Sequence, residues 1–228
     1  MSRWSTLKDI IKLEQKVLSK NDEIAARLAG GFRERGIFAV NMISSPGSGK
    51  TSLLEAVLPR IAGKVRCAVL EGDVQTENDA RRIEKLGVPV RQIITCGSCH
   101  LDSLMIEEHL DALPLDRTDL LFIENVGNLV CPSSYSLGED EKLVVLSAAE
   151  GDDKPLKYPA VFRKSSILVV NKIDLIPLTD FDLERAVHNA RGINPKLEVF
   201  PLSCRTGEGV ETFCEALVRR VETKRAAG

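Results

Sequence analysis

The chain has 228 residues, of which 43% are hydrophobic and 28% are charged. These shares are typical of folded globular proteins and exclude global disorder, while the length excludes a large multidomain machine. The net charge of -2, from 31 basic and 33 acidic residues, offers no basic excess for a nucleic-acid-binding groove. We therefore expect one domain with a small appendage and no nucleic-acid partner.

The sequence shows no sign of a membrane or export function. No apolar run reaches the roughly 18 residues that span a bilayer, and the first residues lack the apolar stretch of a signal peptide. We expect a cytoplasmic protein with no membrane partner, in which cysteines are thiols, metal ligands or core residues rather than disulfides. Its cysteines are Cys67, Cys96, Cys99, Cys131, Cys204 and Cys214. Cys67 and Cys214 fall in strand-like and helix-like patterns, which predicts a core position.

The N-terminal part of the chain predicts an amphipathic helix. Over residues 5–35, apolar side chains from Leu7 to Leu28 recur at helical spacing with charged residues between them. Gly30 and Gly31 loosen the end of this pattern. We therefore expect an N-terminal helical segment, residues 1–35, followed by a second domain, residues 36–228.

Short apolar runs alternate with helix-like stretches through that second domain. The runs are residues 38–43, 65–70, 120–123, 143–146, 166–170 and 199–202. The helix-like stretches are residues 50–62, 77–86, 101–112, 180–191 and 209–225. This alternation predicts an α/β fold with a mostly parallel sheet covered by helices on both faces. The loops at the carboxyl ends of its strands are the candidate binding loops.

The first of these loops carries a phosphate-binding pattern. Residues 44–51 read SSPGSGKT, which fits the P-loop G-x-x-x-x-G-K-[ST] except that Ser44 stands at the first glycine. Glycines let the backbone amides face phosphate oxygens, Lys50 can neutralise the β- and γ-phosphates, and Thr51 can bind Mg²⁺. We disfavour an ordinary glycine-rich turn, because the strand before the loop, the loop itself and the helix after it all match what a P-loop requires. The predicted phosphate contacts are Ser45, Pro46, Gly47, Ser48, Gly49, Lys50, Thr51 and Ser52, with Gly127 from a later loop.

Acids at two strand ends suit a magnesium site. Glu124 ends the third apolar run, and Gly127 follows where a backbone amide can sense a γ-phosphate. Asp73 follows the second run and could hold Mg²⁺ or orient the attacking water. Asp79 is a weaker candidate, because helix starts favour acids through the helix dipole alone. The predicted magnesium ligands are Thr51, Asp73 and Glu124, and the predicted catalytic residues are Lys50, Asp73 and Glu124.

Two later loops indicate that the base is guanine. Asn171-Lys172-Ile173-Asp174 follows an apolar run and resembles the guanine-reading motif of GTPases. A carboxylate can accept from both N1–H and the 2-amino group of guanine, whereas adenine offers neither donor and leaves the carboxylate unpaired. The loop after the last run lies where GTPases place a second base contact. The predicted guanine contacts are Asn171, Lys172, Asp174, Ser203, Cys204 and Arg205, for GTP or GDP with Mg²⁺.

A cluster of cysteine and histidine suggests a second metal. Cys96, Cys99 and His100 lie close in sequence, and Cys131 follows the Glu124 loop. Thiolate and imidazole suit nickel and zinc. The alternatives are a c-type haem site and a redox C-x-x-C site, and neither context surrounds the motif here. Because the adjacent Cys99 and His100 cannot easily both chelate one ion, a site shared across a twofold dimer axis would supply the missing ligands.

Together these residues resemble the HypB-type GTPases that help insert nickel into [NiFe]-hydrogenases. The likeness extends from about residue 5 to the end, with residues 99–102, 124–132 and 150–159 as its most specific segments. It implies a P-loop GTPase of the dimerising SIMIBI type that works with nickel. The implied Ni²⁺ or Zn²⁺ ligands at the dimer interface are Cys99, His100 and Cys131, with Cys96 as a further candidate. The implied partners are a small zinc-containing HypA metallochaperone, docking near the N-terminal segment, and the hydrogenase large-subunit precursor.

Two features depart from the family pattern. Cys96 stands where the family usually has Gly, and neither the Cys-rich nor the His-rich N-terminal motif of some members occurs here, so we expect no nickel storage. The sequence predicts a GTP-hydrolysing nickel metallochaperone for hydrogenase maturation, with metal binding coupled to nucleotide state and dimerisation. The alternatives are a urease-type nickel-insertion GTPase, whose metal motif instead reads Cys-Pro-His, and a regulatory module that only senses metal.

Overall fold

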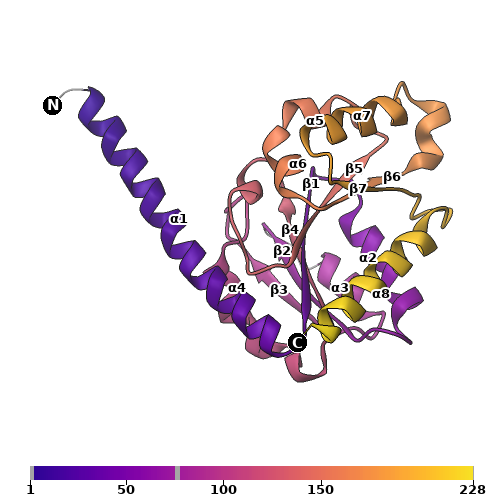
Figure 1. Ribbon diagram of the computed structural model, residues 1–228, viewed down its shortest axis with the longest axis horizontal. Helices are drawn as coiled ribbons and strands as arrows, with labels where there is room; N and C mark the ends of the chain where they lie inside the picture. The colour runs from indigo at the N-terminus through magenta and orange to yellow at the C-terminus, as the bar shows by residue number, and fades with distance from the viewer. Residues whose placement is uncertain (1–2, 75–77, 228) are drawn as a thin grey trace.

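The computed structural model describes residues 3–74 and 78–227, and its centre is a seven-stranded parallel sheet (Figure 1). The strands lie in the order β3-β2-β4-β1-β5-β6-β7, and each neighbouring pair is parallel. Their bounds are β1 Phe38–Ser44, β2 Cys67–Asp73, β3 Val90–Ile94, β4 Leu120–Gly127, β5 Glu141–Ser147, β6 Ile167–Asn171 and β7 Glu198–Pro201. The sheet predicted from the alternating pattern is confirmed.

Helices cover both faces of this sheet, because every parallel crossover returns the chain over one face or the other. The α-helices are α1 Arg3–Glu34, α2 Lys50–Ile61, α3 Asn78–Glu84, α4 Ser103–His109, α5 Lys154–Lys157, α6 Pro159–Lys164, α7 Leu183–Ile193 and α8 Val210–Ala226. Short 3-10 turns are η1 Leu110–Ala112, η2 Leu115–Arg117, η3 Cys131–Ser133 and η4 Ile173–Leu178. Within the described ranges, no helix combines the length and the apolar character that a membrane span requires.

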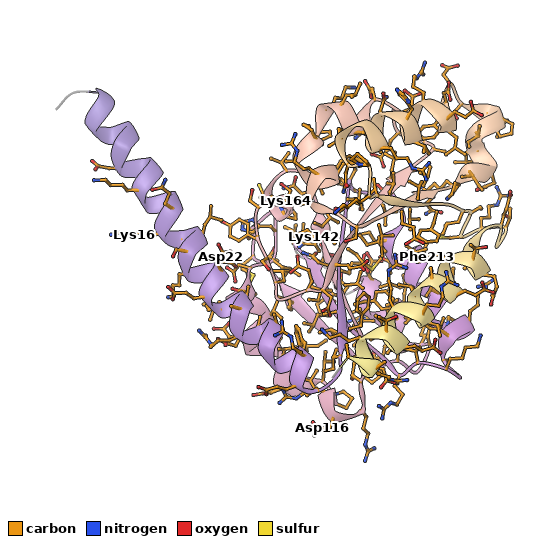
Figure 2. All side chains as sticks on the ribbon, viewed as in Figure 1. Lys16, Asp22, Asp116, Lys142, Lys164 and Phe213 are labelled. Atoms are coloured by element: carbon orange, nitrogen blue, oxygen red, sulfur yellow. The ribbon has the colours of Figure 1, made fainter. Side chains whose placement is uncertain are left out.

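The alternation of side chains along β1 divides the core between two faces. Phe38, Val40 and Met42 pack with α2 and α8 on one face, where Phe213 lies buried between α8 and the sheet (Figure 2). Ala39 faces the other side and packs with α1 and α4. All seven residues of β1 are buried. Burial on both faces explains why the strands read as continuous apolar runs.

Three elements differ from the sequence-based expectation. β3 was missed because Arg91 and Gln92 interrupt its apolar run, which an edge strand of the sheet tolerates. α5 and α6 were missed because each contains a proline, at residues 155 and 159. Both prolines stand in the first turn, where no backbone donor is lost. The predicted helix over residues 77–86 is α3, and its first predicted residue, Glu77, lies outside the described residues.

The N-terminal helix α1 extends well beyond the body of the molecule (Figure 1). Among the side chains of α1 that the structure describes, those that pack on the domain lie in its C-terminal part and include Ile24, Leu28 and Phe32. Asn21 fixes the point of departure: its side chain donates to Ser136 O at 2.9 Å and accepts from the Ser103 amide at 2.8 Å. The predicted N-terminal helix is confirmed. The first apolar side chains of its predicted stripe, Leu7, Ile10 and Ile11, lie outside the described side chains.

Candidate functional site

The loop between β1 and α2 has the shape of a phosphate cradle. Gly47 and Gly49 adopt φ of 75° and 98°, the left-handed region that glycine tolerates without strain. A Cβ on Gly49 would lie 2.5 Å from Nδ2 of Asn171, so this position excludes a side chain. Lys50 begins α2, and its Nζ donates to Ser44 Oγ at 3.0 Å. Ser44, at the first glycine of the pattern, therefore supplies a hydroxyl that holds the P-loop lysine.

Three carboxylates converge beside this loop. One oxygen from each of Glu71, Asp79 and Glu124 lies within 4.8 Å of the others. Glu71 and Glu124 are opposite each other in the β2–β4 register, and each has a buried Oε2 without a hydrogen-bond partner. Thr51 Oγ1 donates to Glu124 Oε1 at 2.8 Å. Burial raises the pKa of both glutamates; that of Glu71 rises to about 8, and the nearby Glu124 charge contributes. Orphaned carboxylate oxygens around a hydroxyl fit a hard divalent cation such as Mg²⁺.

This arrangement differs from the predicted magnesium ligands. Asp73 ends β2 and its Oδ1 accepts a hydrogen bond from the following backbone amide, but it is not one of the three clustered carboxylates. Asp79, the weaker candidate from the sequence, belongs to the cluster, and Glu71 was missed. An acid inside the otherwise apolar second run was the signal that could have identified Glu71, because an unpaired buried carboxylate is costly without a function.

A pocket of about 600 Å³ opens beside the P-loop, where the guanine motifs meet. It is lined by Ser52, Glu55, Ala56, Arg60, Asn171, Lys172, Asp174, Leu175, Cys204 and Arg205. Asn171 ties its loops together. Its Nδ2 donates to Ser48 O at 3.0 Å, and its Oδ1 accepts from the amides of Lys172 at 2.7 Å and Cys204 at 3.2 Å. One side chain therefore connects the P-loop to both predicted base-contact loops.

The carboxylate of Asp174 is held at the wall of this pocket. Ser203 is fully buried and its Oγ donates to Asp174 Oδ1 at 2.6 Å, while Arg205 Nη1 lies 3.7 Å from Oδ2. Ser203 therefore orients Asp174 and does not itself line the pocket. Lys172 adopts a left-handed φ of 61° and its Nζ donates to Gly47 O at 2.7 Å, which places its stem between the two loops.

The second predicted metal cluster also assembles. The ligand atoms of Cys99, His100 and Cys131 lie within 4.8 Å of one another, and Cys99 Sγ is 3.7 Å from His100 Nδ1. Their adjacency is therefore no obstacle to sharing an ion, contrary to the expectation from sequence. Burial lowers the pKa of His100, which favours the neutral imidazole that binds metal, and its ring packs on Tyr135 with centroids 4.0 Å apart. Cys96 is exposed, with φ of 50°, and is not in this group.

Strand β4 joins the nucleotide loop to the thiol cluster. Glu124 lies within the strand and faces Thr51, and Gly127 ends it beside the P-loop. A Cβ on Gly127 would lie 3.0 Å from Cα of Pro46, so the two backbones touch. Cys131 begins η3 just beyond. The segment that touches the P-loop at Gly127 is therefore separated from Cys131 by only three residues.

Comparison with known proteins agrees with these motifs. The sequence profile of the CobW/HypB/UreG nucleotide-binding domain matches residues 38–201. The hydrogenase maturation factor HypB of Escherichia coli strain K12 is 47% identical over 218 residues, which are 96% of this chain and 74% of that protein. This chain belongs to the CobW/HypB/UreG family. The family consists of P-loop GTPases, as the motifs predicted.

Some relatives are named for the maturation of two enzymes, hydrogenase and urease. The hydrogenase/urease maturation factor HypB of Helicobacter pylori strain J99 is 40% identical over 92% of this chain and 88% of its own length. The crystal structure of HypB from Helicobacter pylori in complex with nickel matches with a TM-score of 0.86 and 38% identity, over 90% of this chain and 97% of that chain. HypB from Archaeoglobus fulgidus matches with a TM-score of 0.83 and 35% identity, over 89% and 99%. The predicted family and fold are confirmed.

One segment of this family member approaches the P-loop in a way that the motifs did not predict. Glu150 Oε1 accepts from Ser48 Oγ at 2.5 Å. Lys154, at the start of α5, lies 3.0 Å from Glu150 Oε2 and donates to Ser45 Oγ at 3.2 Å. A lysine and a carboxylate thus contact two P-loop serines. Only the family likeness of residues 150–159 indicated this segment, because it lies more than 100 residues from the loop.

Proposed function

We propose that this HypB family member is a GTP-hydrolysing nickel metallochaperone that assists nickel insertion into [NiFe]-hydrogenase. The proposal rests on one observation: Cys99, His100 and Cys131 converge at the end of the strand whose Glu124 faces the P-loop. Thiolate and imidazole are donors that nickel accepts, and HypB from Helicobacter pylori has been crystallised with nickel. Nickel is the cargo in this reading, and GTP is the substrate.

Each side chain of the nucleotide site has a proposed role. Lys50 and the amides at the start of α2 bind the phosphates, and the 44–52 loop with Gly127 encloses them. Asp174, held by Ser203, accepts from guanine. Thr51 and Glu124, with Asp73, Glu71 and Asp79 around them, would hold Mg²⁺, which neutralises developing charge on the phosphate oxygens. Lys50, Asp73 and Glu124 remain the proposed catalytic residues.

We further propose that the metal site is completed in a homodimer. One chain supplies three ligands in a half-exposed position, whereas a closed nickel or zinc site takes four or more. A twofold axis through the cluster would double the donors. Val130 is 58% exposed next to Cys131, and Ile94 is 47% exposed two residues before Cys96. Exposed apolar side chains beside an incomplete site suit an interface between copies. Cys96 would then be an additional ligand or part of the interface.

The N-terminal segment is the proposed contact for a partner. The stretch of α1 before Asn21 leaves the domain, and Val17 is 49% exposed there. The domain division that we propose is an N-terminal helical segment, residues 1–35, of which α1 is the described part, and a GTPase domain, residues 36–228. The relatives' role in hydrogenase maturation implies partners in that process. We assign a HypA-type metallochaperone to this helix, and the hydrogenase large-subunit precursor as the final acceptor of nickel.

The test is nickel and zinc binding in both nucleotide states. The wild type, Cys99→Ala, Cys131→Ala and Cys96→Ala are titrated with each metal in GDP and in a non-hydrolysable GTP analogue, with mass measured by light scattering. Cys67→Ala, at the opposite end of the sheet, is the control. We expect nucleotide-dependent binding that is lost in Cys99→Ala and Cys131→Ala, with a dimer in the GTP state.

Two outcomes separate the alternatives. Equal metal affinity in GDP and GTP states, or binding that survives both substitutions, would contradict the coupled metallochaperone. A nickel-transfer assay from the loaded protein to a HypA-type acceptor then distinguishes delivery from sensing, because a module that only senses metal retains its nickel.

A further inference from the structure

The guanidinium of Arg82 connects two helices next to the nucleotide site. Arg82 lies in α3, and its Nε and Nη2 bind the two carboxylate oxygens of Glu55 at 2.9 and 2.6 Å. Nη2 also donates to Ser52 Oγ at 3.2 Å, and Nη1 donates to Asp79 Oδ1 at 2.8 Å. All three guanidinium nitrogens of Arg82 therefore make hydrogen bonds. Nε and Nη2 bind residues of α2, and Nη1 binds a residue of α3 itself. Such a planar fork fixes the direction of each partner, which a lysine cannot do.

The partners of Arg82 belong to two different parts of the site. Ser52 and Glu55 line the pocket that we assign to guanine. Asp79 is one of the three clustered carboxylates. The same guanidinium thus links the α2 wall of the pocket to the cluster that fits Mg²⁺.

Asp79 is the member of the cluster that the sheet does not position. Glu71 and Glu124 lie on neighbouring central strands and are 2% and 3% exposed. The Asp79 side chain is 39% exposed and belongs to the first turn of the seven-residue helix α3. A half-buried aspartate on a short helix has several rotamers, and fixing one of them needs a partner. Among the described contacts, Arg82 is that partner.

We propose that Arg82 is a positioning residue that holds Asp79 in the carboxylate cluster and ties the cluster to α2. This inference rests on the proposed GTPase function and concerns the magnesium step of that same site. Residues that orient metal ligands typically change metal affinity by about 10- to 100-fold when they are removed. The loss of Arg82 should therefore weaken the magnesium-dependent part of nucleotide binding and leave the magnesium-independent part unchanged.

The experiment measures a fluorescent GDP analogue binding to the full chain while Mg²⁺ is varied, and again in excess EDTA. The variants are Arg82→Gln, Asp79→Asn and the double variant. Lys85→Gln is the control, because it removes one positive charge just beyond α3. We expect Arg82→Gln to raise the Mg²⁺ concentration for half-maximal tightening about tenfold, to leave affinity in EDTA within about twofold, and Lys85→Gln to match the wild type.

The double variant decides whether Arg82 acts through Asp79. If it does, adding Arg82→Gln to Asp79→Asn changes the magnesium dependence no further, since coupled residues are not additive. Additive effects, an unchanged magnesium dependence, or an equal loss of affinity with and without Mg²⁺ accompanied by a lower melting temperature would each overturn the inference. A wild type that binds no guanine nucleotide would instead overturn the proposed function.

Discussion

At the scale of single residues, we propose that Asp174 determines which base the pocket accepts. Its carboxylate is held by Ser203 at the pocket wall. Asp174→Asn should weaken GDP binding roughly 10- to 100-fold, because hydrogen bonds to a charged acceptor are lost. It should improve binding of xanthosine diphosphate, whose 2-carbonyl can accept from the new amide. Competition binding with GDP, xanthosine diphosphate and ADP measures both changes. Asp180→Asn, an exposed acid nearby, is the control; an unchanged order of preference would contradict the assignment.

The buried carboxylate of Asp119 predicts a pH-dependent stability. Arg66 hydrogen bonds hold its pKa well below the usual range, and Arg225 adds to the effect. A depressed folded-state pKa stabilises the protein above the unfolded pKa of about 3.9, and this contribution is lost as the pH falls below it. Asp119→Asn should lower the free energy of unfolding by about 2 kcal/mol at pH 7. The difference from the wild type should begin to shrink below about pH 5 and should go on shrinking below about pH 3, as the pH approaches the depressed folded-state pKa.

Urea denaturation at a series of pH values tests this prediction. Asp116→Asn serves as the control, because Asp116 is 95% exposed at the edge of the molecule (Figure 2). A stability difference for Asp119→Asn that stays constant down to pH 3 would mean that the two arginines do not act through the charge.

Residues within one loop were predictable, and residues brought together by the sheet were not. The P-loop and the guanine motif each occupy consecutive positions, so their spacing alone encodes the chemistry. Glu71 becomes a neighbour of Glu124 only because β2 pairs with β4, although β3 lies between these two strands in sequence. Likewise, only the fold shows that Glu150 and Lys154 reach the P-loop serines.

At the scale of elements, the packing of α1 on the domain depends on a glycine in the loop between η3 and β5. Gly138 has φ of +82°, and a Cβ there would lie 2.6 Å from Leu28 Cβ and 2.9 Å from the Ala29 amide. Gly138→Ala must therefore displace α1 and adopt a strained conformation, at a cost of about 1–3 kcal/mol. Thermal unfolding and limited proteolysis near Leu28 should both show the loss. Gly192→Ala, in α7 with open space around it, should be neutral or stabilising.

The strands that read as continuous apolar runs could be predicted, because a strand that is buried on both faces of the sheet must be apolar at nearly every position. β3 does not follow this pattern, because it is an edge strand that pairs with a neighbouring strand on one side only. The end of α1 was indicated by glycines, but the position at which it leaves the domain was not. That position is set by Asn21, whose partners Ser103 and Ser136 lie more than 80 residues away.

At the scale of the whole molecule, we propose that the contact between Gly127 and Pro46 transmits the nucleotide state to the cluster of Cys99, His100 and Cys131. Gly127→Ala would place a methyl 3.0 Å from the P-loop backbone. We expect weaker GTP binding and a smaller difference in nickel affinity between GDP and GTP states, while nickel binding without nucleotide stays unchanged. Nickel titrations in the three states measure this, with Gly63→Ala as the control since nothing surrounds that position. A full nucleotide response in Gly127→Ala would contradict the role of this contact.

The projecting part of α1 also affects how the particle diffuses. At 1.5 Å per residue, the 18 residues of the helix before Asn21 add an arm of roughly 27 Å to a 25.0 kDa chain. An arm of that length increases the frictional coefficient with little added mass, so a monomer should elute from a sizing column ahead of a compact standard of equal weight. A truncated chain that starts at Asp22 should elute later by more than its lost mass explains. Nucleotide-driven association is therefore best followed by light scattering or sedimentation equilibrium, which report mass independently of shape.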